Sequence, residues 1–152
     1  MNLTTNKTII RDATENDAKE ILDLVRELAI YEKAEDQVTA TIEDYQKSLK
    51  MHKIYCKLAE IDGKVVGIAL YYETFSTWRG LMYYLEDFVV SKAYRGHGIG
   101  QLLMDAYIDE AKKAGAVLVK WQVLDWNEPA VNFYQKMGAT IEKEWWNVKM
   151  FL

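Results

Sequence analysis

The stretch Tyr94-Arg95-Gly96-His97-Gly98-Ile99-Gly100 decides how the chain is interpreted, because three glycines alternate with other residues directly before a helical pattern. Glycine adopts backbone conformations that other residues avoid, so successive N–H groups of such a loop can point to one place. The following helix adds the positive end of its dipole. Arg95 contributes a full positive charge and a fork of donors that suits phosphate oxygens. The stretch therefore predicts a phosphate-binding loop.

Two other glycine-rich phosphate loops do not fit these letters. A Walker loop ends in Gly-Lys-Ser or Gly-Lys-Thr, and the dinucleotide-binding fingerprint requires glycine at positions 96, 98 and 101. This chain has Gln101 and no lysine at the corresponding place. The alternative to phosphate binding is a plain strand-to-helix turn, which seldom needs three glycines. We interpret His97 as loop lining and not as a catalytic base.

Before the loop, the pattern predicts one strand, two helices and three further strands. Helices open at Thr14 and Thr41, because each threonine is followed three residues later by a carboxylate, Asp17 or Asp44, in the pattern of a capping pair. The first helix is expected to bury Ile21, Leu24, Val25 and Leu28. The predicted strands are Lys7–Arg11, Ile54–Ile61, Lys64–Thr74 and Leu81–Val90, with Asp62-Gly63 forming a tight hairpin turn.

After the loop, the pattern predicts a helix to about Lys113, a strand at Val117–Val123 and a helix capped by Asn127 with Pro129 in its first turn. Gly115 and Gly138 end the two helices. The inner stripe of the first helix is Ile99, Leu103, Ala106, Tyr107 and Glu110 or Ala111. A final pair of short strands is expected at Thr140–Glu144 and Asn147–Leu152, with Trp145 and Trp146 between or within them. The order suits an α/β (mixed α+β) fold, with a mostly antiparallel mixed sheet flanked by helices.

Composition narrows the class of protein. A chain of 152 residues with half of them hydrophobic suits a single domain, residues 1–152, and no linker or repeat marks a boundary. With 19 basic and 23 acidic residues, the charge of -4 favours a cationic partner over nucleic acid. The single Cys56 allows no internal disulfide, and no Cys/His cluster predicts a metal. No segment predicts a membrane span, so we expect a soluble, cytoplasmic protein.

Arg95-Gly96-His97-Gly98-Ile99-Gly100 matches the Q/R-x-x-G-x-G/A signature, and the chain is similar to the GNAT acetyltransferases. Within them it most resembles the diamine acetyltransferases, the branch that includes the spermidine/spermine and thialysine enzymes. The resemblance covers about Ile10 to Gly138. It is carried by Tyr84-Leu85-Glu86-Asp87-Phe88, Trp126-Asn127-Glu128-Pro129 and Asn132-Phe133-Tyr134.

The resemblance implies acetyl-coenzyme A as co-substrate and no metal. The backbone of Phe88, Val89 and Val90 would pair with the pantetheine arm. The pyrophosphate would lie against Arg95, Gly96, His97, Gly98, Ile99, Gly100 and Gln101. The other side would be lined by Asn127, Glu128, Pro129, Ala130 and Tyr134.

Acetyl transfer requires a neutral amine, although an alkylammonium has a pKa of roughly 10.4. The resemblance implies Glu86 as the base or substrate anchor, and Tyr134 as the acid that protonates the leaving sulfur. Asp87 is also a candidate substrate contact. In a regular strand, however, Asp87 and Glu86 point to opposite faces, so both reach one site only if the strand contains a bulge.

The resemblance also implies substrate contacts at Tyr31, Glu32 and Trp78, near the acidic Glu35 and Asp36. Ser76-Thr77-Trp78 replaces an Asp-Pro-Trp of the polyamine enzymes, which favours a lysine-like amine such as thialysine over long polyamines. Because the tail is shorter, the resemblance leaves open whether Glu144 reaches the substrate. A protein lysine or N-terminal acetyltransferase and a non-catalytic coenzyme A sensor remain alternatives. The branch implies a homodimer.

Overall fold

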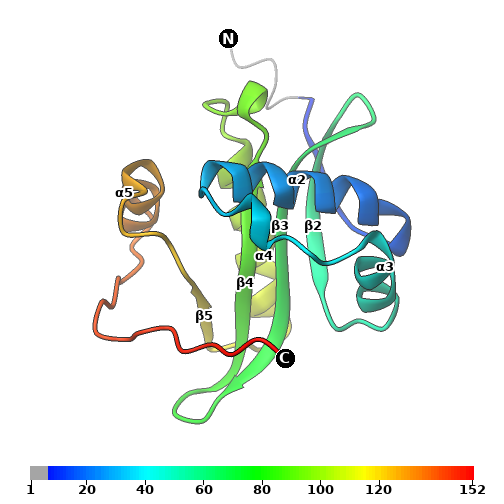
Figure 1. The fold of residues 1–152 in the computed structure, drawn as a ribbon. Coiled ribbons are helices and arrows are strands. Elements are labelled where there is room, and N and C mark those ends of the chain that lie inside the picture. The colour runs from blue at the N-terminus through cyan, green and yellow to red at the C-terminus, as the bar shows by residue number, and fades with distance from the viewer. Residues whose placement is uncertain (1–6) are drawn as a thin grey trace. The chain divides into compact units, whose positions relative to one another are not determined.

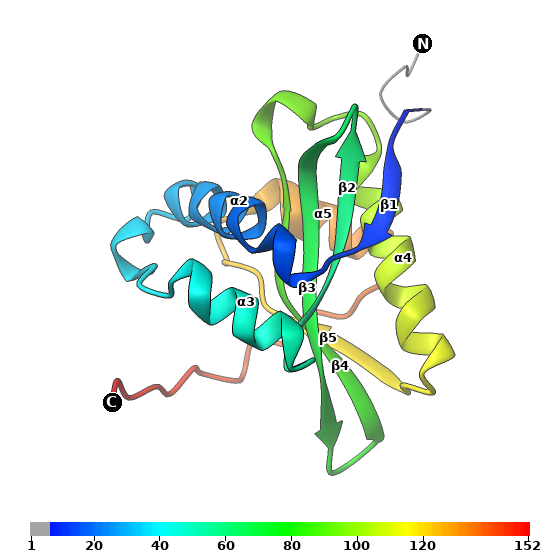
Figure 2. The same ribbon diagram turned by 90° about the vertical axis from the view of Figure 1, so that its right-hand side faces the viewer.

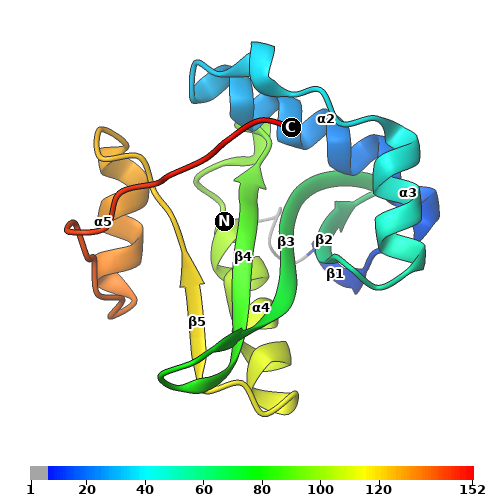
Figure 3. The same cartoon turned by 60° about the horizontal axis from the view of Figure 1, so that its bottom comes forward.

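The computed structural model describes residues 7–152 and divides into two compact units, one ending at Gln122 and one comprising Val123–Leu152. The first unit contains a five-stranded sheet in the order β1-β2-β3-β4-β5 (Figures 1 and 3). All neighbouring strands are antiparallel except β4 and β5, which run parallel. The predicted mixed, mostly antiparallel sheet is therefore confirmed. Its strands are β1 Ile9–Asp12, β2 Tyr55–Ile61, β3 Lys64–Ser76, β4 Gly80–Val90 and β5 Leu118–Trp121.

Helices cover both faces of this sheet. Figure 2 shows α2 (Ala18–Tyr31) and α3 (Ile42–Lys50) on one face, and α4 (Ile99–Lys113) on the other. Short 3-10 turns lie at η1 Glu15–Asp17, η2 Glu35–Gln37 and η3 Lys92–Tyr94. No helix in residues 7–152 has both the length and the apolarity needed to cross a membrane.

The helix starts follow from local hydrogen bonds. Thr41 accepts from the backbone N–H of Asp44 at 3.2 Å, and the Asp44 carboxylate accepts from the backbone N–H of Thr41 at 2.8 Å. Thr14 and Asp17 form a second capping box, in which Asp17 accepts from the backbone N–H of Thr14 at 2.8 Å. Both predicted capping pairs are confirmed, although the first turn after Thr14 is a 3-10 turn that leads into α2.

The face covered by α2 and α3 holds a hydrophobic cluster. It contains the predicted Ile21, Leu24 and Val25, with Leu28 partly buried beside them. Its members are Ala18, Ile21, Leu24, Val25, Leu49, Cys56, Leu58, Ile68, Leu70 and Val89. Burial of such side chains contributes about 1.5–3 kcal/mol each before the cost of ordering the chain. This cluster fixes α2 and α3 against β2, β3 and β4.

The opposite face is closed by α4, whose Ile99, Leu103 and Tyr107 are fully buried. The helix approaches β3 closely at Gly67, where an added Cβ would lie 2.9 Å from Leu103 Cδ1 and 3.2 Å from Val89 O, so a larger residue would require these atoms to shift. Of the two residues predicted to complete the inner stripe, Ala111 is buried, whereas Glu110 forms an ion pair with Lys57 at 3.3 Å.

The hairpin between β3 and β4 extends beyond the rest of the sheet (Figure 2). Pairing with β2 ends at Tyr55 opposite Tyr71, and pairing with β5 begins at Met82 opposite Leu118. The predicted β2–β3 hairpin is also present. Its turn residues Asp62 and Gly63 have φ angles of 50° and 78°.

The second unit contains α5 (Glu128–Lys136). Asn127 caps this helix by accepting from the backbone N–H of Ala130 at 3.4 Å, and Pro129 lies in the first turn, as predicted. The strands predicted at Thr140–Glu144 and Asn147–Leu152 are wrong, because both ranges lack strand pairing in the structure. A strand is stabilised by hydrogen bonds to a neighbouring backbone, and the β preference of the residues does not supply that neighbour. The apolar side chains from Trp145 onward are consequently exposed.

Candidate active site

A bulge in β4 brings two acidic residues to the same face of the sheet. Leu70 of β3 is opposite Asp87, and the next residue, Tyr71, is opposite Leu85, so Glu86 is the extra residue between these pairs. Such an insertion reverses the alternation of side chains at that point. Asp87 shares the face of its partner Leu70, which belongs to the cluster under α2 and α3. The Glu86 carboxylate accepts from the hydroxyl of Tyr72 on that same face, at 3.1 Å.

Glu86 and Asp87, together with Glu32 at the end of α2, form a group that we call the acidic cluster. Burial, and then the charges of Glu86 and Glu32, raise the pKa of Asp87 to about 7. Burial also raises the pKa of Glu32. The charges of Glu86 and Glu32 thus disfavour the ionised form of Asp87, so a cation placed among the three would be stabilised. They do not form a group able to hold a metal ion among the described residues.

Tyrosine hydroxyls surround the acidic cluster. Burial and the charges of Asp87 and Glu86 raise the pKa of Tyr45, on α3, to about 12. Burial, the Glu86 charge and the hydrogen bond to Glu86 raise the pKa of Tyr72 to about 12. Tyr84 stacks on Tyr72 with ring centroids 5.4 Å apart. These hydroxyls stay protonated near neutral pH, so the site offers hydrogen-bond donors and acceptors around a negative centre.

The glycine loop lies at the start of α4. Gly96 and Gly98 have φ angles of 80° and 81°, in the left-handed region that favours glycine. Gly98 is the N-cap residue, and no side chain caps the helix there. The first helical bond runs from the backbone N–H of Leu102 to Gly98 O, at 3.2 Å. The amides of residues 99–101 therefore have no carbonyl within the helix, which is the arrangement that binds anions.

Between the acidic cluster and this loop, β4 continues past the end of its pairing with β5. The parallel pairing with β5 ends at Leu85 opposite Trp121, whereas pairing with β3 continues to Val90. This part of β4, which is not paired with β5, contains the residues predicted to bind the pantetheine arm, Phe88, Val89 and Val90. An amide-containing chain can add to a sheet edge as a further strand.

Glu27 of α2 is a residue that the sequence analysis did not single out. Its carboxylate accepts from the backbone N–H of Lys92 at 2.8 Å and from the Ser91 hydroxyl at 3.2 Å. The Arg95 guanidinium lies 3.9 Å from the same carboxylate. Only the acidic character of α2 could have pointed to Glu27, because its partners lie more than 60 residues away in the sequence.

Arg95 links the loop to two other elements. Its Nε donates to Val90 O at 2.8 Å, and its guanidinium carbon lies 5.5 Å from the ring centre of Tyr31, the last residue of α2. Tyr31 is one of the predicted substrate contacts. The structure thus brings Tyr31 to the glycine loop, while the neighbouring Glu32 belongs to the acidic cluster.

Trp78 does not join the acidic cluster. It lies in the turn between β3 and β4, and its side chain is 83% exposed. The strand from Gly80 to Glu86 spans about 20 Å at the usual rise per residue. Glu35 and Asp36 lie in η2 and are exposed.

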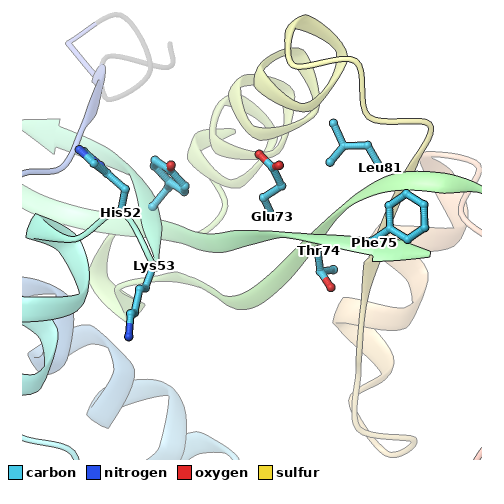
Figure 4. Close-up of a pocket in the computed structure, with 7 residues that line it drawn as sticks. His52, Lys53, Glu73, Thr74, Phe75 and Leu81 are labelled. Carbon is cyan, nitrogen blue, oxygen red and sulfur yellow. The ribbon is translucent and has the colours of Figure 1, made fainter. Parts of the chain in front are cut away.

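A separate pocket of about 540 Å³ lies along the same hairpin and extends to Phe75 and Leu81, a pair near its turn (Figure 4). Glu73 and Thr74 extend to opposite sides of β3 there. Glu73 is opposite Tyr83, whose ring stacks on Tyr71 at 5.4 Å. Tyr71 in turn contacts Tyr107 of α4, which places Glu73 on the face away from the acidic cluster. None of the predicted site residues lines the pocket, which is formed by His52, Lys53, Tyr55, Glu73, Thr74, Phe75 and Leu81.

The remaining predicted site residues belong to the second unit. Asn127 caps α5, and Glu128, Pro129 and Ala130 form its first turn. Tyr134 is buried, with 7% of its surface exposed, and its ring packs edge-on against Phe133 at 5.7 Å. Glu144 accepts from the backbone N–H of Lys143 at 3.1 Å. The roles of these residues stay predictions.

Curated relatives match most of the chain. A thialysine N-epsilon-acetyltransferase of Bos taurus is 37% identical over 155 residues, which cover 94% of this chain and 91% of the relative. Spermidine/spermine N(1)-acetyltransferase-like protein 1 of Homo sapiens is 34% identical over 153 residues, covering 93% of this chain and 22% of that protein.

A comparison of structures and a family match agree with these relatives. The structure of an aminoglycoside acetyltransferase from an uncultured soil metagenomic sample matches with a TM-score of 0.81 at 23% identity, over 97% of each chain, and shows the shared fold. Residues 18–139 match the acetyltransferase (GNAT) family. The chain therefore belongs to the GNAT family of acetyltransferases and is an acyltransferase.

Proposed function

We propose that the protein transfers the acetyl group of acetyl-coenzyme A to a primary amine of a small diamine or lysine-like substrate, with thialysine favoured. The observation that carries the proposal is the β4 bulge, because it places Glu86 and Asp87 on one face, next to the part of the same strand that continues past β5. The acidic cluster suits an alkylammonium, and the part of β4 beyond β5 suits the amide-containing arm of the cofactor.

The chain has residues that fit acetyl-coenzyme A. Arg95 and residues 96–101 would hold the pyrophosphate, since the first-turn amides of α4 point out of an uncapped helix end. The backbone of Phe88, Val89 and Val90 would pair with the pantetheine arm, and Asn127–Ala130 would line its other side. Bound there, acetyl-coenzyme A would supply the acetyl thioester.

The residues of the acidic cluster would handle the proton of the amine. Asp87 and Glu32 would hold the ammonium, and Glu86 would remove a proton, directly or through water, so that the neutral amine can attack the acetyl group. The carboxyls need to be ionised to do so, and the pKa of Asp87, at about 7, leaves it ionised at mildly alkaline pH. Tyr134 would donate a proton to the leaving sulfur.

Direct attack by the amine is favoured over an acetylated enzyme. Cys56 has 3% of its surface exposed and packs in the cluster under α2 and α3. Burial raises the pKa of its thiol well above the usual value, which suppresses the nucleophilic thiolate. Cys56 is therefore a core residue, and the amine of the acceptor is the nucleophile.

The relatives guide the choice of acceptor. Three of them, from Bos taurus, Sus scrofa and Mus musculus, are thialysine N-epsilon-acetyltransferases at 36–37% identity. The exposed Ser76-Thr77-Trp78 turn lacks the carboxylate that the polyamine enzymes carry there, which weakens the case for long polyamines. We also propose a homodimer and a cytoplasmic location, both from the family resemblance.

A thiol-release assay tests this function. Acetyl-coenzyme A is supplied with thialysine, lysine, putrescine, spermidine or a lysine-containing peptide, and coenzyme A thiol is measured against time. We expect the highest kcat/KM with thialysine. The peptide as preferred acceptor would establish protein acetylation instead, and binding of acetyl-coenzyme A without release for any amine would establish a sensor.

A further inference from the structure

We propose that Glu27 is a positioning residue that fixes the cofactor loop from α2 and links this loop to the acceptor end of the same helix. The inference rests on the proposed binding of acetyl-coenzyme A. Glu27 itself does not touch the acetyl group or the amine in this proposal. It acts through Ser91, Lys92 and Arg95.

Glu27 takes the place of a missing cap. Ser91 is the N-cap residue of η3, but its own side chain makes no capping bond. Instead, the Glu27 carboxylate accepts from the first backbone N–H of the turn, that of Lys92, and from the Ser91 hydroxyl. The backbone N–H of Ser91 also donates to Val66 O at 2.8 Å. The chain is thus held to both β3 and α2 immediately before the glycine loop.

The same carboxylate helps to set the direction of Arg95. The Arg95 side chain is fixed at Nε by Val90 O, while its Nη2 lies 3.9 Å from Glu27 Oε1 and its guanidinium lies over the Tyr31 ring. Glu27 and Tyr31 are four residues apart on α2 and therefore share one side of the helix. One side of α2 therefore contacts both the start of the glycine loop and the positively charged Arg95.

The negative charge of Glu27 would repel the pyrophosphate of coenzyme A. Its hydrogen bonds, in contrast, order the loop that would bind this group. Two bonds to a carboxylate, one of them to a backbone N–H, are strong enough for ordering to prevail. Removing them leaves the start of the loop without its cap, so cofactor binding would have to order it. If removal of the Glu27 carboxylate lowers the affinity for coenzyme A, ordering of the loop contributes more to binding than the repulsion between Glu27 and the pyrophosphate costs.

Calorimetric titration with coenzyme A tests the inference in Glu27→Ala, Glu27→Gln and wild type. We expect about tenfold weaker binding for Glu27→Ala, in the range of a charge-assisted hydrogen bond. Glu27→Gln retains acceptor oxygen at the same reach, so it should recover most of the affinity. In steady state, the KM for acetyl-coenzyme A should rise while kcat changes less than about threefold, a split that general destabilisation does not produce.

Asp23→Ala is the matched control, because Asp23 lies one turn earlier on α2 and forms an exposed ion pair with Lys19. Coenzyme A affinity in Glu27→Ala within twofold of wild type would overturn the inference, as would an equal loss in Asp23→Ala. If Glu27→Ala does not fold, Glu27→Asp decides, because its carboxylate is one methylene group shorter: coenzyme A affinity within twofold of wild type would overturn the inference. Wild type that binds no coenzyme A would refute the proposed function itself.

Discussion

The glycine loop and the acidic cluster lie at the two ends of one short stretch of β4 and recognise charge by opposite means. The loop presents backbone N–H groups, ordered by the left-handed Gly96 and Gly98, at the positive end of α4. The acidic cluster presents carboxylates, two of them on the β4 bulge. Binding through backbone N–H groups tolerates most side-chain substitutions, whereas binding through carboxylates can change when a single residue is replaced. In the proposed function, this difference lets the acceptor change while the cofactor stays the same.

Removal of the base gives the largest expected effect. In Glu86→Gln, kcat should fall on the order of 10³-fold near neutral pH, because a positioned base contributes about 10²–10⁴-fold. Coenzyme A affinity should be unchanged, since residues 96–101 are intact. Stopped assays over pH 6–10 with thialysine would measure both the loss and the pH profile. Tyr72→Phe, which removes only the hydroxyl that binds Glu86, is the control and should lose far less. An unaltered pH profile in Glu86→Gln would exclude a base role.

Loss of the proposed acid should have a smaller effect. Tyr134→Phe keeps the buried ring and its packing on Phe133 and removes only the hydroxyl. We expect kcat to fall on the order of 10²-fold, at the lower end of general acid catalysis, with little change in coenzyme A affinity. Steady-state kinetics and calorimetric titration measure the two quantities separately. Intact turnover would remove Tyr134 from the mechanism.

Asp87 tests the electrostatics of the acidic cluster through stability. Its pKa is raised to about 7 from 3.8, so the folded carboxyl keeps a proton that the unfolded chain has already lost. The resulting penalty on the folded state is absent below about pH 4, grows as the pH rises to about 7 and is complete above that value. A pKa rise of this size corresponds to roughly 4 kcal/mol, and water relaxation around the site should reduce it to about 2 kcal/mol.

Asp87→Asn should therefore stabilise the fold by about 2 kcal/mol at pH 8 and by almost nothing at pH 3.5. Urea unfolding at several pH values measures this difference, with Asp36→Asn at an exposed position as the control. A gain that does not depend on pH would show that Asp87 does not carry the raised pKa. The same variant should lose activity with the amine, since it removes part of the acidic cluster.

Features that depend on local sequence were predictable. The Thr41 and Asp44 capping box and the left-handed Gly98 follow from residues within one turn of the chain. The bulge at Glu86 was not predictable from alternation, because it depends on how Leu70 and Tyr71 pair with a strand elsewhere in the sequence. Glu27 was missed for the same reason, since its bonds to Ser91 and Lys92 span 64 and 65 residues.

In the C-terminal segment Asn147–Leu152, the error is the reverse, because the sequence predicted a strand that the structure lacks. The residue types of Asn147–Leu152 favour a strand, but residue preference does not provide a partner strand. Pairing requires a neighbouring backbone, which the structure does not supply to this segment. Its apolar residues are consequently exposed, with Val148 at 96%.

The smallest expected effect comes from a comparison of Gly96→Ala with Gly63→Ala. It distinguishes a role of Gly96 in binding coenzyme A from the backbone strain that alanine causes at both positions. Gly96 and Gly63 have almost the same φ, 80° and 78°, and an added Cβ meets no atom within 4 Å at either position. Alanine should therefore cost a similar free energy of unfolding at both, about 1 kcal/mol from the left-handed backbone. Gly96→Ala should also weaken coenzyme A binding by about fivefold, because relief of the strain turns N–H groups away from the anion. Gly63→Ala, in the β2–β3 turn, should bind coenzyme A like wild type. Thermal unfolding and calorimetric titration of the two variants give the comparison, and equal coenzyme A affinities would show that the left-handed backbone at Gly96 only turns the chain.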